Sequence, residues 1–432
     1  MNSNNPLVSG KIKNYKFSQN AFLSKEVSIS LSEEYGLNYT SLVKAGDSVQ
    51  EGEIIAKAVN GEDTSYIHAS LPGKVLDIAP SYSPDGKHDY AIKIKFGGSL
   101  SYLGKKVIES KIEDLTPDVI TQTLIDKGVI NTFDISKPAN LGLQIKNNKQ
   151  KRNLVIRMYD EDPYRITDSL ITKFYLNEIV KAAKVLARAM KANCIFFAID
   201  QKIEDKNLFY SLDLPQYHVL EMNLNRYPCG TPREISSNFR RSQLKKTCSF
   251  EVTKKDLYTD SSTMYEVYKA AICSIPSISK KVHFSGNCLN SSCLLDVKIG
   301  TPLKDIVSQL GGFYKTPVLI IINGGICGTS VRSLDVPITK YVKSVEFVSN
   351  VKKTNCHVYS CVNCGNCRSA CPVNLSPDIL YNNTINYKHM QKDITTSSSA
   401  CIECGRCNTV CPARLPLCQI ISLLKEKITK NE

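Results

Sequence analysis

Eight of the chain's 17 cysteines fall into two runs that share one spacing. Each run reads C-x2-C-x2-C-x3-C and is followed directly by a proline. The cysteines are Cys361, Cys364, Cys367 and Cys371 in the first run and Cys401, Cys404, Cys407 and Cys411 in the second. This spacing binds [4Fe–4S] clusters, because three cysteines of a tight loop can bind three irons of one cube. We expect the fourth cysteine to stand at the start of a helix and to ligate the other cluster. The predicted ligand sets are Cys361, Cys364, Cys367 and Cys411 for one cluster, and Cys401, Cys404, Cys407 and Cys371 for the other.

Iron–sulfur ligation is favoured over two other uses of clustered cysteines. A single C-x2-C pair is often a zinc site, but two complete runs with trailing prolines are hard to explain as zinc. Disulfides suit secreted chains rather than a reducing cytosol. Gly365 and Gly405 would let the backbone approach the cubes and donate N–H groups to sulfur. The other nine cysteines are interpreted as buried or incidental thiols, and Cys356 and Cys418, the nearest to the runs, have no required role.

Two clusters that share ligand loops must be close neighbours. Such a pair offers one-electron sites in series and does no bond chemistry itself. The sequence therefore predicts an electron carrier, or the relay of a larger oxidoreductase. Residues 349–432 are expected to form a helical domain with two [4Fe–4S] clusters, in which a helix opens near Pro377.

The composition is that of a soluble folded protein, with 42% hydrophobic and 22% charged residues. It excludes collagen, a coiled-coil rod and disorder as descriptions of the whole chain. No run of about 18 apolar residues occurs, and the first residues are polar, without the apolar core of a signal peptide. We therefore expect the chain to stay in the cytoplasm. The net charge of +14 would suit nucleic acid, an anionic membrane or an acidic protein. Nucleic acid is not predicted as a partner, because no binding fold for it is recognised.

The elements around the cysteine runs indicate an α/β protein of several domains. Residues 1–105 read as short strands joined by turns, where Gly46 and Gly52 can take positive φ. With the phrase HASLPGKV at 68–75 they resemble the barrel-sandwich hammerhead of biotinyl and lipoyl domains. The hairpin at 59–65 lacks the lysine that carries lipoate, so we expect a docking module.

Residues 106–262 are predicted to form an α/β domain with a parallel sheet. A strand at 153–159, a helix at about 169–193 and a strand at 194–199 make a right-handed βαβ unit. Asp168 is expected to cap the helix, and Cys194 to pack as a small hydrophobe.

Residues 263–348 are predicted to form a second region of strands and helices. A strand near 297–299 is followed by a turn and a helix, for which Thr301 is the expected N-cap and Pro302 the first helical residue. A further strand is expected at 318–322, which is a short apolar run that ends at glycines.

With its parts in this order, the chain resembles the C subunit of the Rnf electron transport complex over about residues 12–428. The phrases that carry the resemblance, beside the cysteine runs, are HASLPGKV (68–75), DEDPYRITD (160–168), RYPCGTPREI (226–235), VKIGTPLKDI (297–306), INGGICG (322–328) and DVPITK (335–340). The resemblance implies that residues 106–262 form a flavoprotein-like domain and residues 263–348 a β-grasp-like, SLBB-type segment. It also implies a peripheral subunit on the cytoplasmic side of the inner membrane, bound to integral membrane and other redox subunits. It also implies electron transfer between ferredoxin and NAD(H) that is coupled to ion transport.

The flavin-binding part departs from the family pattern. Where the family has a Gly-rich loop ending in Phe-Pro, residues 128–138 keep only Gly128. The family's Asn-Gly-x-Glu-Cys-Glu-Pro-Tyr reads RMYDEDPY at 157–164, so that Asp162, Pro163 and Tyr164 are the flavin-pocket residues that the resemblance implies. The same three residues could simply shape a loop. Because intruding side chains keep the backbone away from a phosphate, FMN binding and NADH oxidation by this chain stay open.

Three functions remain at this point. The first is the relay subunit of an Rnf-type membrane oxidoreductase, with or without FMN. The alternative is a stand-alone cytoplasmic NADH dehydrogenase module that contains flavin. The third is a scaffold with structural zinc.

Overall fold

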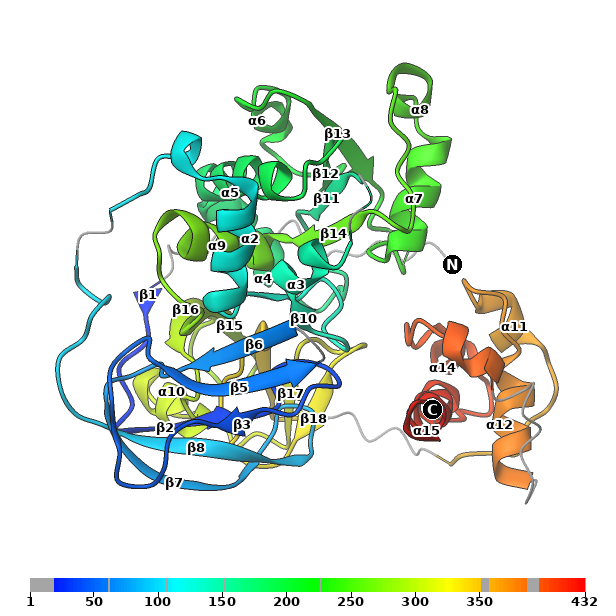
Figure 1. Cartoon of the computed structure of the whole chain (residues 1–432). Coiled ribbons are helices and arrows are strands. Elements are labelled where there is room, and N and C mark those ends of the chain that lie inside the picture. The colour runs from blue at the N-terminus through cyan, green and yellow to red at the C-terminus, as the bar shows by residue number, and fades with distance from the viewer. Residues whose placement is uncertain are drawn as a thin grey trace. The chain divides into compact units, whose positions relative to one another are not determined.

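The structure is a computed structural model, and it describes residues 19–60, 63–105, 108–148, 150, 152–225, 227–350, 357–386 and 396–431. The chain divides into two compact units, Met1–Ser349 and Asn350–Glu432 (Figure 1). Two positions of the expected hairpin at 59–65, and Cys356, lie outside the described residues. Within the described ranges, no helix combines the length and the apolar character needed to cross a membrane.

The first part of unit one consists of two antiparallel sheets around one apolar core. One sheet has the order β2-β8-β7-β4 and the other β3-β5-β6. The strands are β2 (Glu26–Ser30), β3 (Thr40–Ser41), β4 (Ser48–Val49), β5 (Ile54–Asn60), β6 (Asp63–His68), β7 (Gly73–Tyr82) and β8 (His88–Phe96). Gly46 and Gly52 have φ of +98° and +84°, as the turns required.

A four-stranded parallel sheet, in the order β13-β12-β11-β14, forms the centre of unit one. Its strands are β11 (Leu154–Arg157), β12 (Ile195–Asp200), β13 (Tyr217–Met222) and β14 (Leu257–Asp260). Side chains of alternate residues fill two different cores, since Ile156 packs on one face of the sheet and Val155 on the other. Both faces are therefore buried, as in other parallel sheets. The predicted parallel pairing of the strands near 154 and 195 is confirmed, and Cys194 is buried in the second core.

Helices cover both faces of this sheet. The helices are α2 (Pro117–Asp126), α3 (Leu141–Lys146), α4 (Thr167–Phe174), α5 (Leu176–Ala189), α6 (Lys206–Tyr210), α7 (Pro232–Arg241), α8 (Leu244–Thr247) and α9 (Ser261–Val267). Apolar residues of α2, α4, α5 and α9 share one core, and those of α7 pack on the opposite face. Figure 1 shows α2, α5 and α9 gathered beside β11 and β12. Two short strands, β9 (Ile130–Asn131) and β10 (Ala139–Asn140), pair with each other before α3.

The predicted single helix at 169–193 is wrong in two respects. It is two helices, because the backbone leaves the helical region at Tyr175, where φ is −131° and ψ is 33°. Asp168 is also not the N-cap but lies inside the first turn of α4. The carboxylate of Asp160 instead accepts the backbone N–H groups of Asp168 and Ser169, both at 3.0 Å.

The third part of unit one is a mixed six-stranded sheet in the order β1-β16-β15-β19-β17-β18. Its strands are β1 (Gln19–Asn20), β15 (Ser279–Ser285), β16 (Cys293–Lys298), β17 (Leu319–Ile322), β18 (Thr329–Val331) and β19 (Ser344–Val348), and helix α10 (Leu303–Gln309) packs in its core. The strand expected at 318–322 is confirmed. Thr301 does not cap α10, whose N-cap is Pro302 without a side-chain hydrogen bond.

Unit two is helical between its loops, as the sequence predicts. Its helices are α11 (Asn366–Ala370), α12 (Pro377–Asn386), α14 (Arg406–Val410) and α15 (Leu417–Asn431). Its apolar core is small. The core residues that are buried are Cys367, Leu380, Cys407, Ala413, Leu415, Leu417, Ile421 and Leu424.

Candidate functional sites

Each cysteine run folds into a tight loop followed by a five-residue helix. Gly365 and Gly405, with φ of +74° and +68°, precede α11 and α14 in the left-handed region, where glycine has no steric penalty. The fourth cysteine was expected at the start of a helix, and this is wrong. Cys371 and Cys411 follow α11 and α14 as their C-caps, and a turn separates each of them from the next helix.

The two runs exchange their fourth cysteines around two cavities. Cavity one is lined by Cys361, Cys364, Cys367 and Cys411, and cavity two by Cys401, Cys404, Cys407 and Cys371. Each cavity contains about 320 Å³ of space between atoms, open solvent included. The structure therefore brings together the same two sets of four thiols that the spacing predicts.

The residues of both cavities fit an iron–sulfur cube. Four thiols surround each cavity, and the rest of the lining is mainly apolar. Within the described part of the chain, no three His, Cys, Asp or Glu side chains gather as they would around a single metal ion. Burial raises the pKa of the Cys367 and Cys404 thiols. Because only thiolates ligate metal, cluster binding must release protons from these groups.

Asp378 and Cys418 also line the cavities, and sequence reasoning identified neither of them as functional. Asp378 lines cavity one and forms an ion pair with Arg368, with an Nη2–Oδ2 distance of 2.6 Å. Cys418, which the sequence left without a role, lines cavity two. A signal was available, because positions 378 and 418 lie 17 residues after Cys361 and Cys401, respectively.

The three residues predicted for a flavin pocket lie in the loop between β11 and α4. Asp162 is buried, and its carboxylate accepts the backbone N–H groups of Ile326 and Cys327, both at 2.8 Å. It thereby joins this loop to the loop between β17 and β18. Pro163 is half-buried and Tyr164 is exposed. The contacts of Asp162 shape this loop, as the second interpretation of these residues expects.

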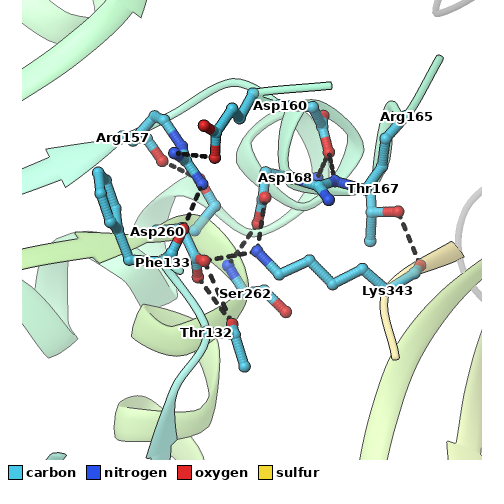
Figure 2. A network of polar contacts seen from close by, with 12 residues as sticks. Thr132, Phe133, Arg157, Asp160, Arg165, Thr167, Asp168, Asp260, Ser262 and Lys343 are labelled. Atoms are coloured by element: carbon cyan, nitrogen blue, oxygen red, sulfur yellow. Dashed lines mark hydrogen bonds and ion pairs between the residues drawn. The ribbon is translucent and has the colours of Figure 1, made fainter. Parts of the chain in front are cut away.

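Side chains fill the space at the carboxyl end of β11, at the edge where open α/β sheets bind their ligands (Figure 2). The guanidinium of Arg157 is fully buried and donates to the backbone oxygens of Phe133, at 3.0 Å, and Gly230, at 2.8 Å. It also lies 4.1 Å from the centre of the Phe133 ring and pairs with Glu161 at 3.2 Å. Arg157 stands where the family's motif has the asparagine of its Asn-Gly pair.

A second buried ion group adjoins this one (Figure 2). The ammonium of Lys343 contacts the carboxylates of Asp168, at 2.8 Å, and Asp260, and all three side chains are buried completely. Burial raises the pKa of Asp168. Burial alone would also raise that of Asp260, but the charges of Lys343 and Arg157 hold the pKa of this carboxyl below its usual range. Thr132 Oγ1 lies 3.2 Å from the Asp260 carboxylate and donates to it.

The residues at this edge do not fit a flavin mononucleotide. In the loop that the family uses for the phosphate, Thr132 and Phe133 are buried side chains. The glycine that remains, Gly128, serves packing instead, since a Cβ there would lie 2.5 Å from the carbonyl oxygen of Tyr66. The backbone N–H groups of Thr132 and Phe133 donate to side chains of the protein, at 2.9 and 3.1 Å, and are therefore not directed at a phosphate.

Two protein families match this chain, one near each end. A family described as the RnfC barrel sandwich hybrid domain matches residues 10–99, and a 4Fe-4S dicluster domain matches residues 360–415. These matches confirm the predicted barrel-sandwich and iron–sulfur domains.

Curated relatives match most of the chain. The C subunit of the ion-translocating oxidoreductase complex of Rhodobacter capsulatus is 26% identical over 419 residues, which are 94% of this chain and 78% of the relative. The C subunit of the Na(+)-translocating ferredoxin:NAD(+) oxidoreductase complex of Acetobacterium woodii is 22% identical over 353 residues, which are 81% of this chain and 79% of the relative. A solved NAD+-reducing [NiFe]-hydrogenase aligns with 55% of this chain and 47% of its own, at 15% identity and a TM-score of 0.43, which is too low to establish a shared fold.

Proposed function

Since the chain is a divergent homologue of the C subunit of Rnf-type ion-translocating oxidoreductase complexes, we propose that it is the electron-relay subunit of such a complex. Unit two would hold two [4Fe–4S] clusters, with cavity one and cavity two as their sites. Unit one would serve mainly as the scaffold and docking part. Two of the relatives are named as parts of ferredoxin:NAD(+) oxidoreductase complexes, which supports a role in transfer between these two carriers.

The exchange of the fourth cysteines is the observation that carries the proposal. Cys371 extends from the first run into cavity two, and Cys411 from the second run into cavity one. Clusters bound there would be linked through the short helices α11 and α14, which contact each other. The clusters supply one-electron acceptor sites, and the residues of the chain hold these sites close together in a mainly apolar setting.

The division of the chain supports the same role. We propose a hammerhead docking domain at 1–105, a flavoprotein-like domain at 106–262, a β-grasp-like segment at 263–348 and the cluster domain at 349–432. Integral membrane subunits and other redox subunits of the complex are the proposed partners. The proposed location is the cytoplasmic face of the inner membrane, where the chain is held peripherally.

FMN is not part of the proposal, because Arg157 and Phe133 occupy the edge where it would bind. The alternative of a stand-alone NADH dehydrogenase needs that flavin. Addition of NADH to the oxidised protein under anaerobic conditions separates the two functions. We expect no bleaching of the cluster absorbance by NADH and full bleaching by dithionite, and NADH-driven bleaching with flavin in the acid extract would establish the alternative.

Anaerobic purification with iron, acid-labile sulfide and zinc analysis tests the relay itself. We expect about eight irons and eight sulfides per chain, since two cubes are proposed. Stoichiometric zinc without sulfide would contradict the relay function and support the scaffold with structural zinc. Membership of a complex is tested by affinity purification of the tagged chain from solubilised membranes, which should recover integral membrane subunits.

A further inference from the structure

The two cavities are related by a 40-residue repeat in the sequence. For each cavity, all of the lining residues except one have a counterpart 40 positions away in the sequence. That counterpart lines the other cavity. The paired positions carry the same or similar residues, such as Gly365 with Gly405 and Leu375 with Leu415. One pair differs in charge, because Asp378 in cavity one corresponds to Cys418 in cavity two.

Asp378 presents a carboxylate to cavity one. Its side chain is 4% exposed, and it lines the cavity together with the predicted ligand Cys367. Arg368 holds the carboxylate through three contacts, of Nε to both oxygens at 2.8 and 3.0 Å and of Nη2 at 2.6 Å. The Arg368 side chain is 49% exposed and does not line the cavity. The negative end of the ion pair therefore faces the cluster site, and the positive end faces solvent.

In cavity two the corresponding two positions carry no charge, and they make a different contact. Arg368 corresponds to Asn408, whose side-chain oxygen accepts the backbone N–H of Cys418 at 2.8 Å. The Cys418 side chain lines cavity two together with the predicted ligands Cys401 and Cys407. Cavity two thus has a neutral thiol, which can donate a hydrogen bond, where cavity one has a carboxylate.

We propose that this pair of positions makes the two cluster sites unequal, so that Asp378 lowers the reduction potential of a cluster in cavity one and Cys418 raises that of a cluster in cavity two. The proposal rests on the relay function proposed above. An electron that enters the pair would settle in cavity two. This transfer would move one electron from the site in cavity one, which is oxidised, to the site in cavity two, which is reduced. It would break or form no bond and would transfer no proton.

Charge and hydrogen bonding act in the same direction here. Reduction adds negative charge to a cluster, and a nearby carboxylate raises the cost of this addition. The more distant guanidinium of Arg368 offsets the cost only in part. A thiol donor beside sulfur has the opposite effect, because hydrogen bonds to the sulfurs favour the reduced cluster. Asp378 and Cys418 are positioning residues in this account, since they act through the cluster ligands.

Redox titration of the anaerobic full-length protein, followed by EPR, tests the proposal. We expect two midpoint potentials in the unaltered protein. The Asp378→Asn variant should raise only the lower one, so that the ratio of reduced to oxidised cluster at a fixed potential rises about tenfold, equal to about 59 mV for a one-electron couple. Cys418→Asp should lower only the higher one. Cys418→Ser keeps a small donor, and it is the matched control that should change either potential less than Cys418→Asp does.

Three results would overturn the proposal. The first is that Asp378→Asn leaves both midpoint potentials unchanged. The second is that this variant raises the higher potential. The third is that Asp378→Asn and Cys418→Asp change the same potential. Iron and sulfide analysis of each variant shows whether both clusters are present, so that loss of a cluster is distinguished from a shift. If the unaltered protein lacked iron and sulfide, the relay function itself would be wrong. If it held two clusters that ignored position 378, the relay would stand and this inference would fall.

Discussion

Cys371 belongs to the first cysteine run by sequence and to cavity two by position. Because its thiol lines the cavity with Cys401, Cys404 and Cys407, its loss should affect the cluster of the second run. We predict that Cys371→Ser removes or alters the EPR signal of that cluster and leaves the other unchanged, with about half of the iron and sulfide lost. A signal change confined to the first cluster would contradict the exchanged ligation.

Cys248→Ser is the matched control for this prediction. Cys248 is a half-buried cysteine of unit one, far from the cluster ligands in sequence. We expect this variant to keep the full content of iron and sulfide. A loss of cluster in both variants would indicate a general effect of oxidation or misfolding rather than ligation.

His68 makes the stability of unit one depend on pH. Its side chain is buried between β6 and α2, and burial together with the charge of Lys340 lowers its pKa to about 3. The imidazole is neutral in the folded state but protonates below about pH 6.5 in the unfolded chain. Its contribution to stability is therefore complete above pH 6.5 and is lost as the pH falls towards 3.

We predict that His68→Gln reduces this loss. Glutamine can donate to the carbonyl of Asp126, as His68 does, but it does not titrate. Between pH 6.5 and 5, the free energy of unfolding should fall by about 1–2 kcal/mol more in the unaltered protein than in the variant. Urea denaturation followed by tyrosine fluorescence measures the difference, and equal losses in both proteins would show that His68 is not the group responsible.

Lys343 joins three elements of unit one through its ammonium group. It lies just before β19 and contacts Asp168 in α4 and Asp260 at the end of β14. We predict that Lys343→Met destabilises unit one by about 3–5 kcal/mol, because two buried carboxylates lose the charge that compensates them. Addition of Asp168→Asn and Asp260→Asn should recover part of the loss.

Lys304→Met is the matched control for the buried lysine. Lys304 pairs with Asp335 at 2.8 Å, but both side chains are more than half exposed. Water screens such a pair, so the expected cost is below about 1 kcal/mol. Similar costs for Lys304→Met and Lys343→Met would contradict the view that burial makes the Lys343 group important.

Sequence patterns located the elements of the parallel sheet but not their ends. The apolar-rich run at 153–159 and the periodic apolar residues after it indicate a strand and a helix, because these patterns depend on local burial. The break at Tyr175 leaves no such signal. The cap of α4 comes from Asp160 rather than Asp168, because Asp168 is needed as a partner of Lys343, 175 residues away. Contacts between residues so distant in sequence cannot be read from a local pattern.

The cysteine spacing identified both thiol sets because it is itself a local pattern with a fixed geometry. It did not show which neighbours line the cavities. Asp378 and Cys418 are separated from their runs by a turn and the start of a helix, and only the folded helices α12 and α15 bring them to the cavities. At the edge of the sheet near Arg157, the sequence showed only that glycines of the family pattern are missing. It did not show that side chains fill this edge, because these side chains come from several segments of the chain.

Each of the two units has its own apolar core. We therefore expect the two units to unfold in separate transitions. Unit two has few buried apolar residues, so metal binding is expected to supply much of its folding free energy. We predict two transitions on denaturation, one that abolishes the cluster absorbance and one that exposes the tyrosines of unit one. Removal of iron with a chelator should eliminate the first transition and part of the helical circular dichroism while moving the midpoint of the second by less than about 1 °C. Lys343→Met should shift only the second. A single transition that all probes follow together, before and after iron removal, would contradict this division, because two-state unfolding requires one cooperative core.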